Sequence, residues 1–205
     1  MRIPQLTLCA LFAAMLAGPA LADRGNHNGY DCPVGFVSGK TLDQEFGPGT
    51  QELTECNKVR HNVKLAIQLN VYETSPGSAY GLHNITNVID DYEITYGMRP
   101  GKDYEIVAVV HSGGGPLVLQ NGIPFTGMTD GLPHTTVNAH QAEVEALIAK
   151  GVKFLFCMNT TRGFQKANKL PADATSALIP GVGYVTAGIA ALGDLQARGY
   201  QYVQP

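Results

Sequence analysis

The sequence lacks tryptophan and lacks the short motifs that mark several common enzyme classes. It has no G-x-S-x-G, which counts against an α/β-hydrolase elbow. It has no C-x-x-C and no C-x-x-C-H, so a thioredoxin-like dithiol and c-type haem attachment are both unsupported. Its six histidines include no H-E-x-x-H or H-x-x-x-H spacing, and no metal site is predicted.

A positive charge excess and long apolar runs are also missing. Lys and Arg number 14 against 17 Asp and Glu, a formal net charge of −3, which argues against a nucleic-acid or anionic-membrane surface. The longest apolar run, residues 6–16, is shorter than the roughly 20 residues that a membrane span needs. The sequence therefore predicts no membrane insertion.

The first 22 residues have the layout of a secretory signal peptide. One positive charge, Arg2, precedes the apolar run, and the small-residue pattern Ala20-Leu21-Ala22 comes before Asp23. Cys9 lies inside the run and not at the cleavage point, which disfavours a lipoprotein. We therefore expect a periplasmic or secreted protein.

Three cysteines remain after the predicted cleavage, an odd number for an oxidising compartment. Cys32 and Cys56 share one polar segment rich in turn residues, whereas Cys157 ends an apolar run far downstream. We expect a Cys32–Cys56 disulfide and a free Cys157 thiol. The alternative is that all three thiols are reduced or mispaired and have no role.

The chain divides into a signal peptide at 1–22, an irregular N-terminal extension at 23–60 and one α/β domain at 61–205. In the domain, apolar runs alternate with segments of helical spacing, which predicts a three-layer α/β/α fold around a mainly parallel sheet of about five strands. The expected strands are residues 63–72, 104–111, 152–157, 182–185 and 200–203. The expected helices are residues 78–96, 136–150, a short one capped by Asn159 and one capped by Thr186 and ended by Gly199; a short helix at 49–58 is a further candidate.

Two chemically active side chains end predicted strands, where ligands bind in open α/β sheets. His111 ends the second strand and Cys157 ends the third, just before a predicted helix start whose dipole would stabilise a thiolate. Arg162 lies close enough in sequence to turn toward the same sulfur. The simpler alternative is that Cys157 is a buried, small apolar residue and His111 a structural one.

The run Gly113–Gly115 follows His111 and is a candidate backbone nest for an oxyanion. It does not match G-x-G-x-x-G and no Lys-Ser/Thr follows, so a flexible turn is the alternative. Gly113, Gly114 and Asn159 are the predicted ligand-binding residues.

The domain resembles the DsrE/DsrF-like family of sulfur-handling proteins. The resemblance rests on V-V-H-S-G-G-G, on G-V-K-F-L-F-C-M-N-T-T-R-G and on the tail from L-I-P-G-V-G-Y-V to the C-terminus. It implies a parallel α/β fold, homo-oligomers and a persulfide-carrying cysteine after the third strand, a position that Cys157 occupies. Arg162-Gly163 matches the Arg-Gly that commonly follows that cysteine. An export signal and an N-terminal extension are departures from the usual family member.

Together these observations predict a periplasmic sulfur carrier or sulfurtransferase-like protein. Cys157 would hold the sulfur, His111 would orient or protonate, Arg162 would balance the anion, and no organic cofactor would be needed. Its partners would be a sulfane-sulfur donor and acceptor. The alternative is a non-catalytic module that binds a small ligand or a protein and in which Cys157 is structural. Metal binding by His111 and Cys157 would need at least one more ligand.

Overall fold

The computed structural model describes residues 38–54, 61–73, 79–123 and 137–205. The predicted signal peptide and the two cysteines of the predicted disulfide, Cys32 and Cys56, lie outside these ranges. The strands are β1 (Val63–Leu69), β2 (Tyr104–Val110), β3 (Lys153–Cys157), β4 (Gly183–Val185) and β5 (Gln201–Val203). The α-helices are α1 (Leu42–Phe46), α2 (Thr50–Leu53), α3 (Tyr80–Asp90), α4 (Gln141–Ala149), α5 (Met158–Lys166) and α6 (Gly188–Ala197). A π-helical turn (η1, Asp91–Thr95) extends α3, and two 3₁₀ segments follow β2 (η2, Ser112–Val118) and precede β4 (η3, Ala174–Ala177).

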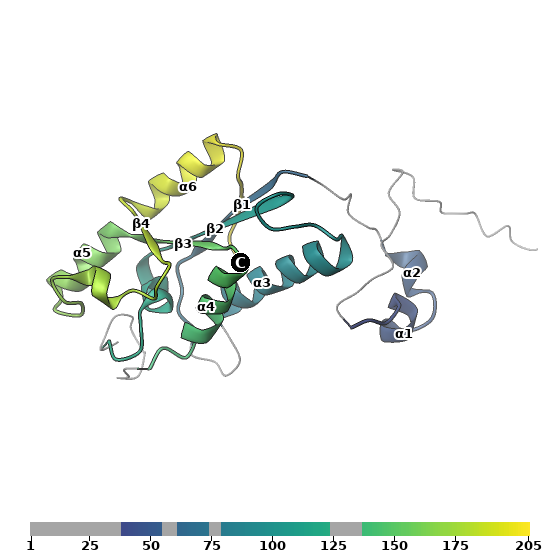
Figure 1. The fold of residues 1–205 in the computed structure, drawn as a ribbon, viewed down its shortest axis with the longest axis horizontal. Helices are drawn as coiled ribbons and strands as arrows, with labels where there is room; N and C mark the ends of the chain where they lie inside the picture. Colours follow the sequence, from purple (N-terminus) through teal and green to yellow (C-terminus); the bar gives the residue numbers. More distant parts are fainter. Residues whose placement is uncertain (1–37, 55–60, 74–78, 124–136) are drawn as a thin grey trace, which may run out of the picture.

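The five strands form one sheet in the order β4-β3-β2-β1-β5, and every neighbouring pair is parallel. The central strands β1 and β2 pair along their whole length, from Val63 opposite Tyr104 to Leu69 opposite Val110. Most of their side chains are apolar because both strands are covered on both faces; Lys64 and Gln68 in β1 and Glu105 in β2 are the exceptions. The predicted three-layer α/β/α fold is confirmed (Figure 1).

The two faces of the sheet are covered unequally. Leu82, Ile85 and Ile89 of α3 and Val144 and Leu147 of α4 belong to the larger core, which covers one face. Phe164 of α5 joins the same core. The opposite face is covered by α6, through Leu192 and Leu195, which pack on Ala66, Val107 and Val109 (Figure 1).

This unequal covering follows from the handedness of the connections. From β1 to β4 the chain moves steadily toward one edge of the sheet, and the helices between these strands lie on one face. To reach β5 it must return past all of them to the other edge, and a right-handed crossover in that direction runs over the opposite face. The chain therefore leaves β3 toward α5 on one face and leaves β4 toward α6 on the other. Adjacent strands whose connections diverge in this way open a crevice at their carboxyl ends.

The helix ends differ in part from the predictions. Cys157, in extended conformation, is the N-cap of α5, so the predicted cap Asn159 lies inside the first turn. The N-cap of α6 is Ala187, one residue after the predicted Thr186. The predicted glycine stops after α4 and α6 are confirmed: Gly151 and Gly199 have φ values of 92° and 86°, which glycine adopts without steric cost.

The N-terminal extension contains two short helices in its described part where one was expected. Thr41 and Gln44 cap α1 reciprocally, and α2 begins four residues after α1 ends. Among the described residues, no helix combines the length and the apolar character needed to cross a bilayer.

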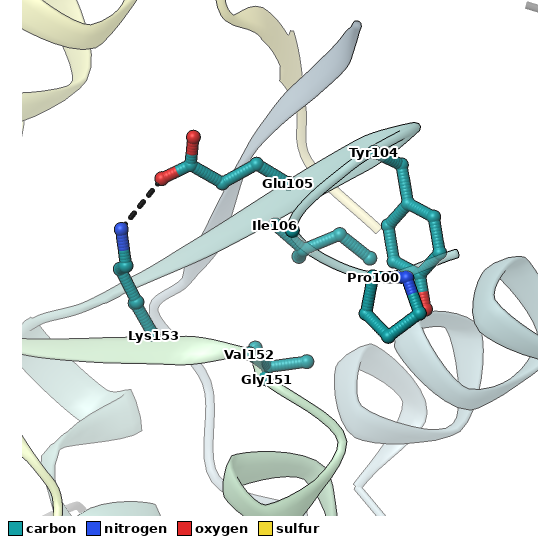
Figure 2. A pocket seen from close by; sticks show the side chains of 8 residues that line it. Pro100, Tyr104, Glu105, Ile106, Gly151, Val152 and Lys153 are labelled. Atoms are coloured by element: carbon teal, nitrogen blue, oxygen red, sulfur yellow. Dashed lines mark hydrogen bonds and ion pairs between the residues drawn. The ribbon is translucent and has the colours of Figure 1, made fainter. Parts of the chain in front are cut away.

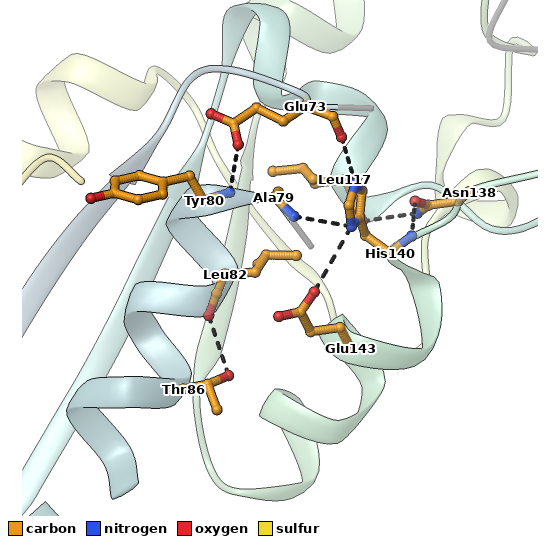
Figure 3. Close-up of polar contacts among 9 residues, drawn as sticks. All are labelled: Glu73, Ala79, Tyr80, Leu82, Thr86, Leu117, Asn138, His140 and Glu143. Carbon is orange, nitrogen blue, oxygen red and sulfur yellow. Dashed lines mark hydrogen bonds and ion pairs between the residues drawn. The ribbon is translucent and has the colours of Figure 1, made fainter. Parts of the chain in front are cut away.

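A buried histidine ties the start of α4 to the chain that follows β1 (Figure 3). His140 Nε2 lies 2.6 Å from the Glu73 carbonyl oxygen, and Nδ1 accepts the amide of Ala79 at 3.2 Å. Since Nδ1 is an acceptor, Nε2 is the nitrogen that donates to the Glu73 carbonyl. Asn138 supports it by donating from its side chain to the Leu117 and Leu119 carbonyls. These bonds satisfy buried backbone groups, which indicates a structural role.

Candidate functional site

The sulfur of Cys157 lies at the carboxyl end of β3, beside the start of α6. Cys157 ends β3, caps α5 and is 4% exposed. Its Sγ accepts the amide N–H of Gly188, the first residue of α6, at 3.1 Å. Two helices of nine and ten residues thus begin at one sulfur atom. Both helix dipoles favour negative charge there.

Polar groups in the first turn of α5 also act on the pKa of this thiol. Burial alone raises the pKa of the Cys157 thiol and is the largest single influence. The amide of Thr160, the amide of Gly188, the Thr160 hydroxyl and the amide of Asn159 act in the opposite direction and outweigh it. The pKa of the thiol is therefore lower than its ordinary value. The sulfur is buried, but among polar donors that suit a thiolate and not among aliphatic side chains alone.

Thr160, whose hydroxyl lowers the pKa of the Cys157 thiol, is itself bonded to the turn after β2. The Ser112 amide donates to Thr160 Oγ1 at 2.9 Å. With that lone pair occupied, the single hydroxyl proton is free to point toward Cys157. Ser112 presents its amide from a left-handed backbone conformation, φ 50°, which is uncommon outside glycine. The turn after β2 and the first turn of α5 are thus joined beside the sulfur.

His111 lies beside Cys157 at the end of the adjacent strand. Val110 pairs with Phe156, so His111 and Cys157 come next on β2 and β3. A Cβ built on Gly188 would lie 3.0–3.2 Å from the Cβ, Cδ2 and Cγ atoms of His111, so the ring packs directly on the first residue of α6. The same Gly188 donates to the sulfur, and the structure therefore brings the two predicted residues together around one glycine.

The ring nitrogens of His111 have different surroundings. Nδ1 is 2.9 Å from Ser112 Oγ. Nε2 is buried and has no hydrogen-bond partner among the described residues. Burial lowers the pKa of His111, so the ring is neutral at neutral pH. A buried nitrogen without a partner is uncommon in folded proteins.

The remaining predicted residues lie around this centre in different ways. The amide of Gly114 donates to the His111 carbonyl, and a Cβ at Gly114 would lie 2.4 Å from the Leu69 carbonyl oxygen. Gly114 is thus required for close packing, and its amide is not available to an oxyanion. Gly113 is half-buried next to it. Arg162 is exposed on α5 and donates to the side chain of Asn159, which leaves stabilisation of the sulfur to hydrogen bonds from backbone amides and a hydroxyl.

Three residues of the centre were not predicted from the sequence: Ser112, Thr160 and Gly188. Thr160 lies in the first turn of α5, and no local pattern in the sequence marks it. Gly188 is 31 positions from Cys157 and follows a different strand, and nothing local marks it. Only the strand order brings it to the sulfur.

A hollow at the opposite end of the sheet is not connected with this centre. It has a volume of about 180 Å³ and lies where β2 and β3 begin (Figure 2). Glu105 and Lys153 at its edge form an ion pair with each other at 2.7 Å, and Tyr104 and Pro100 line its far side (Figure 2). Among the described residues, no group of three or more His, Cys, Asp and Glu side chains is placed to hold a metal ion.

Comparison with known proteins supports the fold alone. No family model matches the sequence. No curated protein matches it either. Among solved structures, a protein of unknown function from Methanobacterium thermoautotrophicum is similar, with 20% sequence identity and a TM-score of 0.50. The match covers 70% of this chain and 100% of that protein.

Proposed function

We propose that the protein is a periplasmic sulfur carrier or sulfurtransferase-like protein that holds sulfane sulfur as a persulfide on Cys157. The observation that supports this most directly is the Gly188 amide bonded to Sγ where α5 and α6 both begin. Such donors favour the ionised form of a thiol, and the thiolate is the form that attacks sulfur. The resemblance of the sequence to DsrE/DsrF-like proteins favours the same chemistry.

The transfer requires no organic cofactor and no redox partner. Cys157 thiolate attacks the outer sulfur of thiosulfate; the new bond joins Sγ to that sulfur, the old S–S bond breaks, and sulfite leaves with its electron pair. With a polysulfide dianion, the chain leaves one sulfur shorter. In the second step an acceptor nucleophile attacks the outer sulfur, and Cys157 leaves as a thiolate. The donors around Sγ serve both steps, because a thiol of low pKa is also a good leaving group.

The surface near the sulfur is suited to an anionic donor. Arg162 and Asn159 are exposed on α5, the helix that begins at Cys157. We assign Arg162 the role of attracting the donor, since a surface cation acts mainly on encounter rates. Homo-oligomerisation, which the family resemblance implies, belongs to the same proposal.

Intact-mass measurement after treatment with polysulfide tests the proposal. We expect wild-type protein to gain the mass of one sulfur atom and a reductant to remove it. Cys157→Ser retains every other cysteine and should not gain this one sulfur atom per chain. Wild-type protein that gains no sulfur, or Cys157→Ser that gains as much, would contradict the proposal.

The low exposure of Cys157 favours one alternative, a non-catalytic binding module in which this cysteine is structural. Alkylation of native protein at neutral pH separates the two. A carrier thiolate reacts with a small reagent in the folded state, whereas a structural thiol reacts only after the protein unfolds. The reagent should be small, because the sulfur is 4% exposed.

A further inference from the structure

The unpartnered nitrogen of His111 calls for a ligand. Nε2 is buried and accepts or donates no hydrogen bond within the described part of the chain, in a residue that is 8% exposed. The Cδ2 atom next to it faces Gly188, the residue whose amide binds Sγ. The opposite edge of the ring faces Ser112. The ring edge that carries Cδ2 and Nε2 is therefore the edge nearer to the start of α6.

We propose that the Nε2–H of His111 binds the outer, negatively charged sulfur of the Cys157 persulfide, so that the protein stores its sulfur as a perthiolate anion. This inference rests on the proposed function and adds to it a binding site for the transferred atom. It gives the buried nitrogen the hydrogen bond that it lacks in the unloaded protein.

The surroundings of the subsite favour an anion. No side chain caps α6 at Ala187, and its first turn has no acidic residue. The start of a helix without a capping side chain directs amides and positive dipole charge at whatever lies in front of it. On α5 the nearest cation, Arg162, is bonded to the uncharged Asn159. The first turns of α5 and α6 contain no acidic residue, so a negatively charged second sulfur atom meets no carboxylate there.

Ser112 is the positioning residue for this subsite. Its Oγ is 2.9 Å from Nδ1 of His111. When the hydroxyl donates to Nδ1, the ring proton resides on Nε2, where it faces the sulfur. The left-handed backbone of Ser112 lets its amide reach Thr160 while its hydroxyl reaches His111. One residue thus contacts both Thr160, beside the inner sulfur on α5, and His111.

Two amide substitutions of His111 test the proposal. Glutamine can place an N–H where Nε2 stands, whereas asparagine reaches only the position of Nδ1. The protein is loaded with polysulfide, loading is measured by intact mass, and the outer sulfur is titrated through the absorbance of the perthiolate. His83→Asn, an exposed position on α3, is the matched control.

We expect His111→Asn to load one sulfur but to lower the acid dissociation constant of the outer sulfur by about tenfold to a hundredfold, the range for losing a hydrogen bond to a charged group. The perthiolate titration then moves upward by about one to two pH units. His111→Gln and His83→Asn should titrate within a few tenths of a unit of wild type. Equal titrations for the asparagine and glutamine variants, shifted or not, overturn the subsite.

A failure of the proposed function looks different. If wild type itself takes up no sulfur, the carrier proposal falls and the subsite with it. If all loaded variants titrate like wild type, the carrier proposal stands and the subsite is wrong. Should His111→Asn not fold, Ser112→Gly decides, since glycine suits the backbone, retains the amide and removes only the hydroxyl. A perthiolate titration that shifts upward in Ser112→Gly supports the subsite, and an unchanged titration refutes it.

Discussion

Replacing Thr160 by valine should raise the pKa of the Cys157 thiol. Valine matches threonine in shape but removes the hydroxyl that accepts from the Ser112 amide and acts on the sulfur. A hydrogen bond to a charged group contributes about 1.5–3 kcal/mol, and one pKa unit corresponds to about 1.4 kcal/mol. The amides of Gly188, Thr160 and Asn159 remain, so we expect a rise near the lower limit, about one unit.

The alkylation rate of native protein as a function of pH measures this shift. Only the thiolate reacts, so the variant should react about tenfold more slowly at pH values below both thiol pKa values. At high pH, where both proteins are ionised, the two rates should converge. This convergence distinguishes a change of pKa from a change of access, which would lower the rate at every pH.

Thr161→Val is the matched control. Thr161 is the neighbouring residue and is buried, whereas Thr160 is half-buried, and the Thr161 hydroxyl donates to the Cys157 carbonyl at 3.1 Å. Its pH profile should stay within a few tenths of a unit of wild type. If Thr160→Val leaves the profile unchanged, or if Thr161→Val moves it as much, the reasoning about the sulfur environment is wrong.

Three further outcomes follow from the packing around the site and away from it. Gly188→Ala places a Cβ 3.0 Å from His111, so it should lower the free energy of unfolding in urea by about 1–3 kcal/mol and slow the alkylation of Cys157. An unchanged unfolding free energy and an unchanged alkylation rate would refute the close contact. His140→Phe retains an aromatic ring but leaves the Ala79 amide and the Glu73 carbonyl without their partner. It should lower the free energy of unfolding in urea by about 1–3 kcal/mol, and a change near zero would contradict the structural role of His140. Hydrogen bonds from Arg99 and then from His61 lower the pKa of Asp103 to about 2 from 3.8, so the stability that this carboxylate contributes is complete above about pH 4 and is lost as the pH falls toward 2. Thermal melts of Asp103→Asn between pH 2 and pH 6, a range chosen to span about these values, should show a weaker pH dependence than wild type.

Much of the fold could be predicted because its central strands are covered on both faces. The segments YEIVAVV and KFLFC are apolar almost throughout, which is typical of strands inside a parallel sheet. Leu82, Ile85 and Ile89 follow helical spacing because α3 packs one face on that sheet. The helix starts were less certain, since neither Cys157 nor Ala187 is a common N-cap residue.

Part of the candidate site could be predicted as well. His111 and Cys157 end apolar strands, and the carboxyl ends of parallel strands meet at one edge. The glycine run was harder to interpret, because a glycine needed for close packing and one that binds a ligand look alike in a sequence. Gly114 belongs to the first kind, since the Leu69 carbonyl leaves no space for a Cβ.

The sequence by itself determined the alternation of strands and helices, and the placement of a histidine and a cysteine at strand ends, because apolar periodicity and strand length are local properties. Only the tertiary structure decided that β4 lies beside β3 and that α6 crosses the opposite face, which puts the Gly188 amide on the Cys157 sulfur. Strand order depends on which long-range pairings bury the most apolar surface together, and no short window of sequence contains that sum.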